Sequence, residues 1–169
     1  MNRRPASPEP ADSTPFRLHI ESDPYAVGEA LSALADSLCR SGASAALIQS
    51  VEIVVAEVLN NIMEHAYRNL PGHPIDIELS RNADGWRLRF TDRGRPMPGE
   101  ILPEGRHQDL DVCRAHLPEG GFGWMMIREL AGSLHYRREG GRNLLELVLP
   151  SAESPCRCRT PGIRFEDGG

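Results

Sequence analysis

The sequence has 169 residues, with 19 Lys and Arg against 24 Asp and Glu, and a formal net charge of −5. This length is typical of one domain, and the negative balance provides no global field that would attract nucleic acid or an anionic membrane surface. We therefore expect a single domain without a direct nucleic-acid partner, in which any anionic ligand is bound by a local site.

The chain shows no sequence signal for a membrane or for secretion. No apolar run approaches the roughly 20 residues that a bilayer-spanning helix needs, and the N-terminus lacks the apolar core of a signal peptide. The expected location is therefore the cytoplasm, without a membrane partner. The cysteines do not have the spacing of a disulfide framework; they are Cys39, Cys113, Cys156 and Cys158.

Both ends of the chain are predicted to be disordered. Residues 1–14 are rich in Pro, Ser and Ala, and residues 151–169 mix Pro, Arg and Gly without hydrophobic periodicity. Such segments bury too little apolar surface to offset the entropy lost on ordering. The folded body is expected at residues 15–150.

The body opens with a predicted strand and an amphipathic helix. Residues 16–20 alternate apolar and polar positions, as a half-buried strand does. Ser22 or Asp23 then suits an N-cap, and Pro24 suits the first helical position. One face of this helix carries apolar residues at helical spacing, namely Val27, Leu31, Leu34 and Leu38.

A second helix begins after Ser44 and is predicted to run to about Asn69. Its apolar stripe is wide, so it should be the central and most buried helix. The stripe consists of Ile48, Val51, Val55, Val58, Leu59, Ile62 and Met63.

The second half of the body predicts two hairpins separated by a third helix. Residues 75–80 and 86–92 alternate as strands around a turn-forming "RNADG", and residues 134–138 and 143–149 do so around "EGGR". The third helix is expected at about 123–132. This element order predicts an α/β (α+β) two-layer sandwich: a mixed, mostly antiparallel sheet with three helices on one face.

One helix face in the second helix has unusual chemistry. Glu57, Asn61 and His65 are spaced at i, i+4 and i+8 and should form one column, with Asn60 and Glu64 beside it. A solvated helix face is the plain explanation, but paired Asn residues in mid-helix cost stability. An amide oxygen is a good ligand for Mg²⁺, and a carboxylate one turn earlier can act as a general base.

Two further motifs suit a nucleotide. Asp92 ends a strand, where a buried carboxylate could accept a hydrogen bond from an exocyclic amine, and Gly94 would let a flat ligand approach; the alternative is a simple Asx turn. Gly120, Gly121 and Gly123 precede a helix whose N-terminus could bind phosphate; the alternative is a hinge into a core helix.

Taken in order, "EVLNNIMEHAY" (57–67), "TDRGRP" (91–96) and "PEGGFGWMMI" (118–127) resemble the N, G1 and G2 boxes of the GHKL ATPase superfamily. The pattern is most similar to the stand-alone anti-sigma-factor serine/threonine kinases. The resemblance covers residues 15–150 and implies the histidine-kinase-like ATP-binding fold.

The resemblance also implies roles for individual residues, with ATP and Mg²⁺ as cofactors. Glu57 would be the general base, and Asn61 the Mg²⁺ ligand, with Asn60 as the alternative. Residues 95–120 would form the ATP lid, where the cation that meets the terminal phosphate could be Arg106, Arg114 or His116. The nucleotide-binding set would be Asn61, Asp92, Gly94, Gly120, Gly121, Phe122, Gly123 and Asn143.

The function implied by the resemblance is an ATP-dependent serine/threonine protein kinase. It would phosphorylate a STAS-type anti-anti-sigma protein, and a sigma factor and a homodimer are further expected partners. The alternative is a non-catalytic, ATP-sensing module that switches binding partners. A third hypothesis is the detached ATP-binding half of a histidine-kinase-like system, which we disfavour because no phosphoacceptor helix precedes the domain in this sequence.

Overall fold

The computed structural model describes residues 14–103 and 122–151. The expected disordered ends, apart from Thr14 and Ser151, lie outside this range, as do residues 104–121. Every predicted helix and strand is present and begins within one residue of its expected start. The elements are β1 (Phe16–Glu21), α1 (Pro24–Arg40), α2 (Ala45–Asn61), η1 (Ile62–Ala66), β2 (Pro74–Asn82), β3 (Gly85–Asp92), η2 (Pro98–Glu100), α3 (Phe122–Leu130), β4 (Ser133–Glu139) and β5 (Arg142–Leu149).

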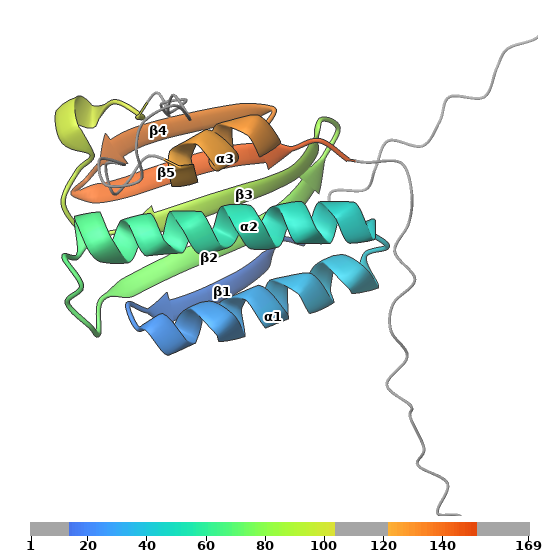
Figure 1. Ribbon diagram of the computed structural model, residues 1–169, viewed down its shortest axis with the longest axis horizontal. Helices are drawn as coiled ribbons and strands as arrows, with labels where there is room; N and C mark the ends of the chain where they lie inside the picture. Colours follow the sequence, from blue (N-terminus) through green and yellow to red (C-terminus); the bar gives the residue numbers. More distant parts are fainter. Residues whose placement is uncertain (1–13, 104–121, 152–169) are drawn as a thin grey trace, which may run out of the picture.

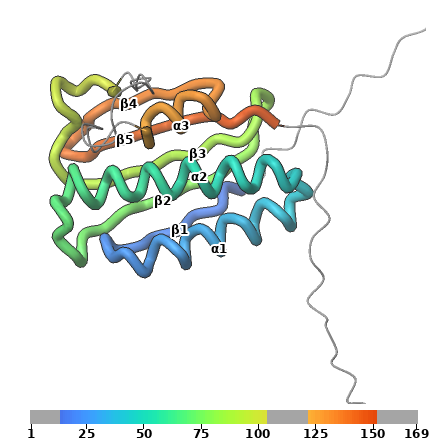
Figure 2. Tube along the Cα trace, in the orientation of Figure 1, coloured from blue at the N-terminus to red at the C-terminus, as the bar shows by residue number. Residues whose placement is uncertain are grey.

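The five described strands form one sheet in the order β1-β2-β3-β5-β4. Each neighbouring pair is antiparallel, so the sheet is antiparallel throughout rather than mixed. The helices α1, α2 and α3 lie on one face of the sheet (Figure 1), and the chain trace shows α2 running between the other two (Figure 2). The predicted α+β two-layer sandwich is confirmed.

Asp23, rather than Ser22, is the N-cap of α1. Its carboxylate accepts a hydrogen bond from the backbone N–H of Tyr25 at 2.8 Å, which satisfies one of the free amides of the first turn. The Ser22 side chain is buried and has a different task. Its hydroxyl donates to the Leu70 carbonyl at 2.7 Å and accepts from the His73 amide at 3.0 Å, which joins the start of α1 to the loop before β2.

The central helix α2 supplies much of the core, as its apolar stripe predicts. Among the described residues, the stretch Ala45–Ala66 is by length and composition apolar enough to cross a membrane, with a mean hydropathy of 1.4, contrary to the sequence expectation. A core helix has the same composition because its neighbours bury it, and α2 contacts α1, α3 and β5. Its buried residues are Leu47, Val51, Val54, Val55, Val58 and Leu59.

The α-helix ends at Asn61, eight residues before the predicted end, and continues as the π-helical turn η1. The amide of Tyr67 bonds the carbonyl of Ile62 at 2.9 Å, a spacing of five residues instead of four. A π-turn shifts the phase of the helix. His65 lies within this turn and is exposed, whereas Glu57 and Asn61 are half-buried.

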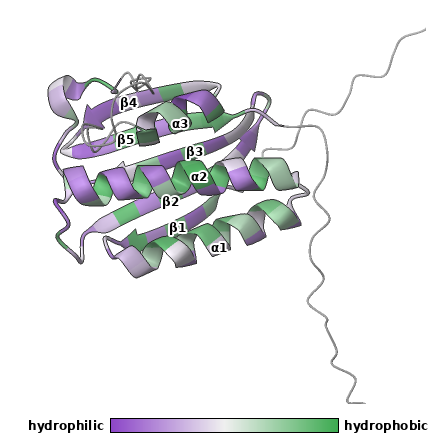
Figure 3. Cartoon of the chain, viewed as in Figure 1, coloured by the Kyte–Doolittle hydropathy of each residue, from purple (hydrophilic) through white to green (hydrophobic). Residues whose placement is uncertain are grey.

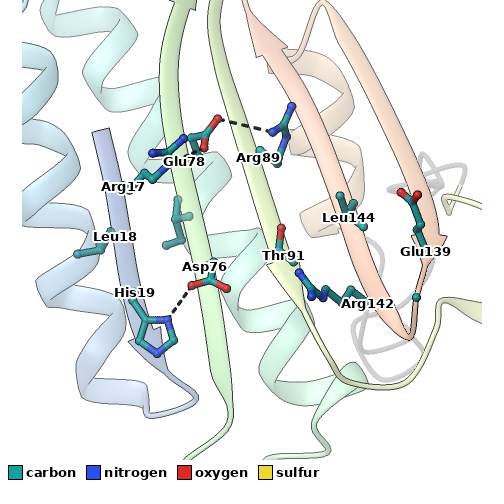
Figure 4. A pocket seen from close by; sticks show the side chains of 12 residues that line it. Arg17, Leu18, His19, Asp76, Glu78, Arg89, Thr91, Glu139, Arg142 and Leu144 are labelled. Carbon is teal, nitrogen blue, oxygen red and sulfur yellow. Dashed lines mark hydrogen bonds and ion pairs between the residues drawn. The ribbon is translucent and has the colours of Figure 1, made fainter. Parts of the chain in front are cut away.

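The second face of the sheet carries no described helix and is lined with charged side chains. Arg17 pairs with Glu78 at 2.9 Å, and Arg89 pairs with Glu146 at 3.0 Å, so the strands are cross-linked by ion pairs. A hollow of about 630 Å³ lies on this face, and Figure 4 shows its lining, with His19 beside Asp76. The predicted nucleotide residues that the structure describes lie elsewhere: on α2, at the start of α3, at and just after the end of β3, and on β5.

Cys39, on α1, is disulfide-bonded. The cysteine spacing did not suggest a disulfide framework and gave no sign of this bond. Sequence separation does not reveal which cysteines meet in three dimensions, and the other three cysteines lie outside the described residues.

Candidate nucleotide-binding site

One wall of the candidate site is the C-terminal half of α2, where hydrophilic bands interrupt the apolar helix (Figure 3). The Asn61 side-chain N–H donates to the backbone carbonyl of Glu57 at 2.7 Å. This bond occupies the amide nitrogen and leaves the Oδ1 atom without a hydrogen bond from any described residue. Asn60, the alternative ligand, is exposed. An oxygen held in this way fits the preference of Mg²⁺ for hard oxygen ligands.

The start of α3 lies directly against this wall. A Cβ atom added to Gly123 would lie 2.3 Å from Oε2 of Glu57 and 3.7 Å from Nδ2 of Asn61. The structure therefore brings together three residues that the sequence predicts to share a site. Phe122 is 45% exposed at the first position of the helix, whereas Gly120 and Gly121 lie outside the described residues.

A magnesium ion at this wall would depend on few protein ligands. The described residues contain no group of three or more His, Cys, Asp or Glu side chains placed to hold a metal ion. Mg²⁺ commonly uses one or two protein oxygens and completes its shell with water and substrate phosphate. The Asn61 oxygen fits that pattern, and a caged metal site is not needed.

Asp92 forms the second part of the site, at the end of β3. Its side chain is buried, at 5% exposure. Oδ1 accepts hydrogen bonds from the Gly94 amide and from the side-chain N–H of Asn143, each at 2.8 Å. Oδ2 accepts none from any described residue. The Asx turn is therefore present, and one oxygen of this largely buried carboxylate is still free to accept a ligand amine.

Burial raises the pKa of the Asp92 carboxyl above its ordinary value, because the buried position disfavours the charged form. Three effects oppose this rise: the hydrogen bonds from Asn143 and Gly94, and the positive charge of Arg138. Burying an ionised carboxylate costs stability. A carboxylate kept in this position despite that cost is a candidate ligand-binding group.

Gly94 lacks a side chain for a reason that is visible in the protein itself. A Cβ atom there would lie 2.6 Å from the Cβ of Ala66 and 2.8 Å from its backbone carbon and oxygen. The Arg95 amide also bonds the Ala66 carbonyl at 3.0 Å. The end of β3 therefore packs against η1, and this contact connects the two parts of the candidate site.

Replacing Gly94 with alanine should destabilise the protein by about 1–3 kcal/mol, the usual cost of overpacking. The methyl group would meet backbone atoms, which cannot rotate away. Unfolding in urea measures the effect. The control is Gly28→Ala in α1, where an added Cβ has no neighbour within 4 Å and alanine should stabilise the helix. Equal stability of the Gly94 variant and the wild type would contradict the packing.

Sequence reasoning missed three residues beside the site, Tyr67, Tyr136 and Arg138. The Tyr67 hydroxyl donates to the Pro74 carbonyl at 2.6 Å and accepts from the Arg93 amide at 2.9 Å, so it ties η1 to the residue after Asp92. Burial raises its pKa. Tyr67 lies at the end of the first motif, which is the only sequence signal for this contact.

The described part of the predicted lid, residues 95–103, is held by hydrogen bonds along its length, beginning with those of Arg95 to Ala66 and Asn143. The Met97 amide donates to the Tyr136 hydroxyl at 3.1 Å, and the Arg128 guanidinium donates to the Pro103 carbonyl at 2.8 Å. The rest of the predicted lid lies outside the described residues, together with the candidate cations Arg106, Arg114 and His116.

The antiparallel sheet, its single helical layer and the polar groups on α2 and β3 define a domain of the histidine-kinase-like type. The family model described as "Histidine kinase-like ATPase domain" matches residues 20–149. The chain therefore belongs to this family, and membership implies the use of ATP.

The individual relatives are serine and threonine kinases. The serine/threonine-protein kinase BtrW of Bordetella bronchiseptica is 32% identical over 112 residues, which cover 64% of this chain and 75% of the relative. The serine-protein kinase RsbW of Oceanobacillus iheyensis is 26% identical over 129 residues, covering 75% and 80%. Both names agree with the kinase family to which the sequence motifs point.

Among solved structures, the RsbU and RsbW domains of Rv1364c from Mycobacterium tuberculosis superpose with a TM-score of 0.58. The identity is 18%, and the match covers 88% of this chain and 35% of the other. At this identity the likeness supports the fold alone.

Proposed function

We propose that the protein is an ATP-dependent serine/threonine kinase of the anti-sigma-factor type, which phosphorylates a STAS-type anti-anti-sigma protein in the cytoplasm. Sequestration of a sigma factor and a homodimeric state belong to the same proposal. The observation that carries it is the position of Glu57, one turn before Asn61 and directly against Gly123 at the start of α3. Its kinase relatives support the reaction type.

In the proposed reaction Glu57 acts as the general base. It accepts the proton of the partner's serine or threonine hydroxyl as that oxygen bonds the terminal phosphorus of ATP and the bond to the ADP oxygen breaks. The N-terminus of α3 faces the Glu57 carboxylate, since the side chain lies against Gly123. This end of the helix dipole favours negative charge nearby.

The remaining residues bind and orient the nucleotide. Asp92 accepts the adenine amine through its free oxygen, and Asn61 provides an oxygen ligand for Mg²⁺. When bound, Mg²⁺ neutralises charge on the phosphate oxygens. Gly94 and Gly123 keep the backbone close to the ligand, and Gly120, Gly121 and Phe122 complete the phosphate side.

Purified protein incubated with radiolabelled ATP, Mg²⁺ and a STAS-domain protein from the native host should transfer label to that partner. Label should be absent when EDTA removes the metal, and absent when the partner's acceptor serine or threonine is replaced by alanine. ATP-dependent complex formation without any transfer of label would contradict the kinase proposal and favour the ATP-sensing binding module.

A further inference from the structure

Three polar residues form a row across neighbouring strands at one end of the sheet. In the strand register, Asn143 on β5 lies opposite Asp92 on β3 and opposite Arg138 on β4. Residues paired across strands point to the same face, which here is the face that the helices cover. Asn143 is 4% exposed and lies in the middle of the row.

The two ends of the Asn143 amide contact different partners. Its nitrogen donates to Oδ1 of Asp92 at 2.8 Å and to the Arg95 carbonyl at 2.9 Å. Its oxygen accepts from the Arg138 guanidinium at 2.5 Å and from the Tyr136 hydroxyl at 2.8 Å. Both groups of this buried amide are therefore satisfied.

The groups on both sides of the amide fix which way it faces: Asp92 Oδ1 and the Arg95 carbonyl are acceptors, and Arg138 on the other side is a donor. A guanidinium has donors and no acceptor, so the amide group beside it must be the oxygen. The Tyr136 hydroxyl already accepts a hydrogen bond from the Met97 amide and uses its own proton on the same oxygen. The amide nitrogen is consequently directed to Asp92.

This orientation decides which atom of Asp92 is free. Oδ1 receives donors from both Asn143 and Gly94, which leaves Oδ2 as the acceptor for a ligand. With the amide reversed, its oxygen would face the Asp92 carboxylate, and the two acceptors would repel each other.

We propose that Arg138, assisted by Tyr136, is a positioning residue that orients Asn143 so that Asp92 presents one fixed acceptor oxygen, and that this makes the site selective for 6-aminopurine nucleotides over 6-oxopurine nucleotides. The inference rests on the nucleotide site proposed above. A site built to accept a hydrogen bond from an amine leaves a buried group unpaired when a carbonyl takes its place.

The same network reaches the predicted lid. Arg138 also donates to the Gly94 carbonyl at 3.1 Å, and Tyr136 holds the Met97 amide. The residues that follow Asp92 are therefore held by the same side chains that orient Asn143. Loss of Arg138 should therefore affect recognition of the base more than it affects the part of the site around Glu57.

The test compares dissociation constants for ATP and ITP by calorimetry on the full chain. The two nucleotides differ in the 6-amino against the 6-oxo group and in the proton that the 6-oxo base carries on N1. The wild type should prefer ATP by at least about 100-fold. In Arg138→Met this ratio should fall about tenfold, through weaker ATP binding. Arg138→Lys, which keeps a positively charged donor group, should restore most of the ratio. Tyr136→Phe should lower it less, since Arg138 remains.

Arg137→Met is the matched control. Arg137 is adjacent on β4 but exposed, and it pairs with Glu139 at 3.6 Å, so its loss should leave the ratio unchanged. An unchanged ratio in Arg138→Met, or an equal loss for both nucleotides that Arg138→Lys does not repair, would overturn the positioning role. If Arg138→Met does not fold, the ratio of ATP to ITP affinity in Arg138→Lys and Tyr136→Phe tests the positioning role instead.

Failure of the kinase proposal is distinguishable in this design, because nucleotide binding is measured without any protein partner. A wild type that selects ATP through Arg138 but transfers no phosphate would retain the positioning role and lose the kinase. A wild type that does not distinguish ATP from ITP would overturn base reading by Asp92 and the positioning role with it.

Discussion

Replacing Glu57 with glutamine should lower phosphoryl transfer to the protein partner by about 10²–10⁴-fold while ATP binding changes little. The range is the usual contribution of a general base. Glutamine keeps the size of the side chain and its contact with Gly123, but its amide cannot accept the hydroxyl proton. The adenine-reading part of the site, around Asp92 on β3, does not include Glu57. The variant should therefore lose single-turnover phosphoryl transfer while its affinity for ATP stays near the wild-type value.

The matched control is Glu64→Gln. Glu64 belongs to the same sequence motif, but it lies on the π-turn and is exposed. Its loss should leave both transfer and binding near the wild-type values. If phosphoryl transfer survives in Glu57→Gln and is lost in Glu64→Gln, the general base would be Glu64, and the assignment of Glu57 would be wrong.

The parts of the fold that follow from local chemistry were predictable from the sequence. Strict alternation locates the strands, and the Gly-Gly turn between β4 and β5 has both residues at positive φ, as a tight hairpin turn requires. The apolar stripe of α2 likewise predicts its central position. In each case the structure depends on residues that are close together in the sequence, so the local pattern is enough to predict it.

The features that the sequence did not predict depend on contacts between distant segments. The π-turn Ile62–Ala66 is followed by Tyr67, whose hydroxyl bonds the Pro74 carbonyl and the Arg93 amide from segments later in the chain. The row of Asp92, Asn143 and Arg138 exists only through the strand register. Asn143 was expected near the adenine site, whereas nothing in the local sequence marks Arg138 as the residue that orients it.

Gly94 shows how a motif residue can have two explanations. Its position after Asp92 suggested space for a flat ligand. In the structure, an added Cβ would first meet Ala66, so packing alone requires glycine here. The motif spacing is consistent with both requirements, and the ligand role remains a proposal to be tested apart from stability.

Asp92→Asn should weaken ATP binding by at least about 100-fold, or about 2.7 kcal/mol. In the variant, the side-chain oxygen would still accept from Gly94 and Asn143, as Oδ1 does now. The new NH₂ group would then take the place of the free oxygen. It is a donor, so it would oppose the adenine amine, and it would suit a 6-oxopurine instead. The variant should therefore bind ATP more weakly than the wild type does, whereas its affinity for ITP should fall little or rise.

The same variant should not be less stable than the wild type at pH 7, although it loses function. The pKa of Asp92 is raised in the folded protein above its ordinary value of 3.8, mainly by burial. The folded state therefore binds more protons than the unfolded state just above pH 3.8, and wild-type stability falls as pH rises through this window. Asparagine does not titrate. The stability of Asp92→Asn relative to the wild type should therefore be lowest below pH 3.8 and should reach its full value once the pH exceeds the pKa of Asp92 in the folded protein.

Urea unfolding of both proteins at pH 3 and pH 7.5 measures this difference, and the other carboxyl groups cancel because they are common to both. A variant that is clearly less stable at pH 7.5 would mean that the ionised carboxylate closes the end of β3 as a structural group. A variant that keeps its stability but loses ATP would identify Asp92 as a group retained for the ligand at a cost to the fold, as its burial and its free oxygen indicate.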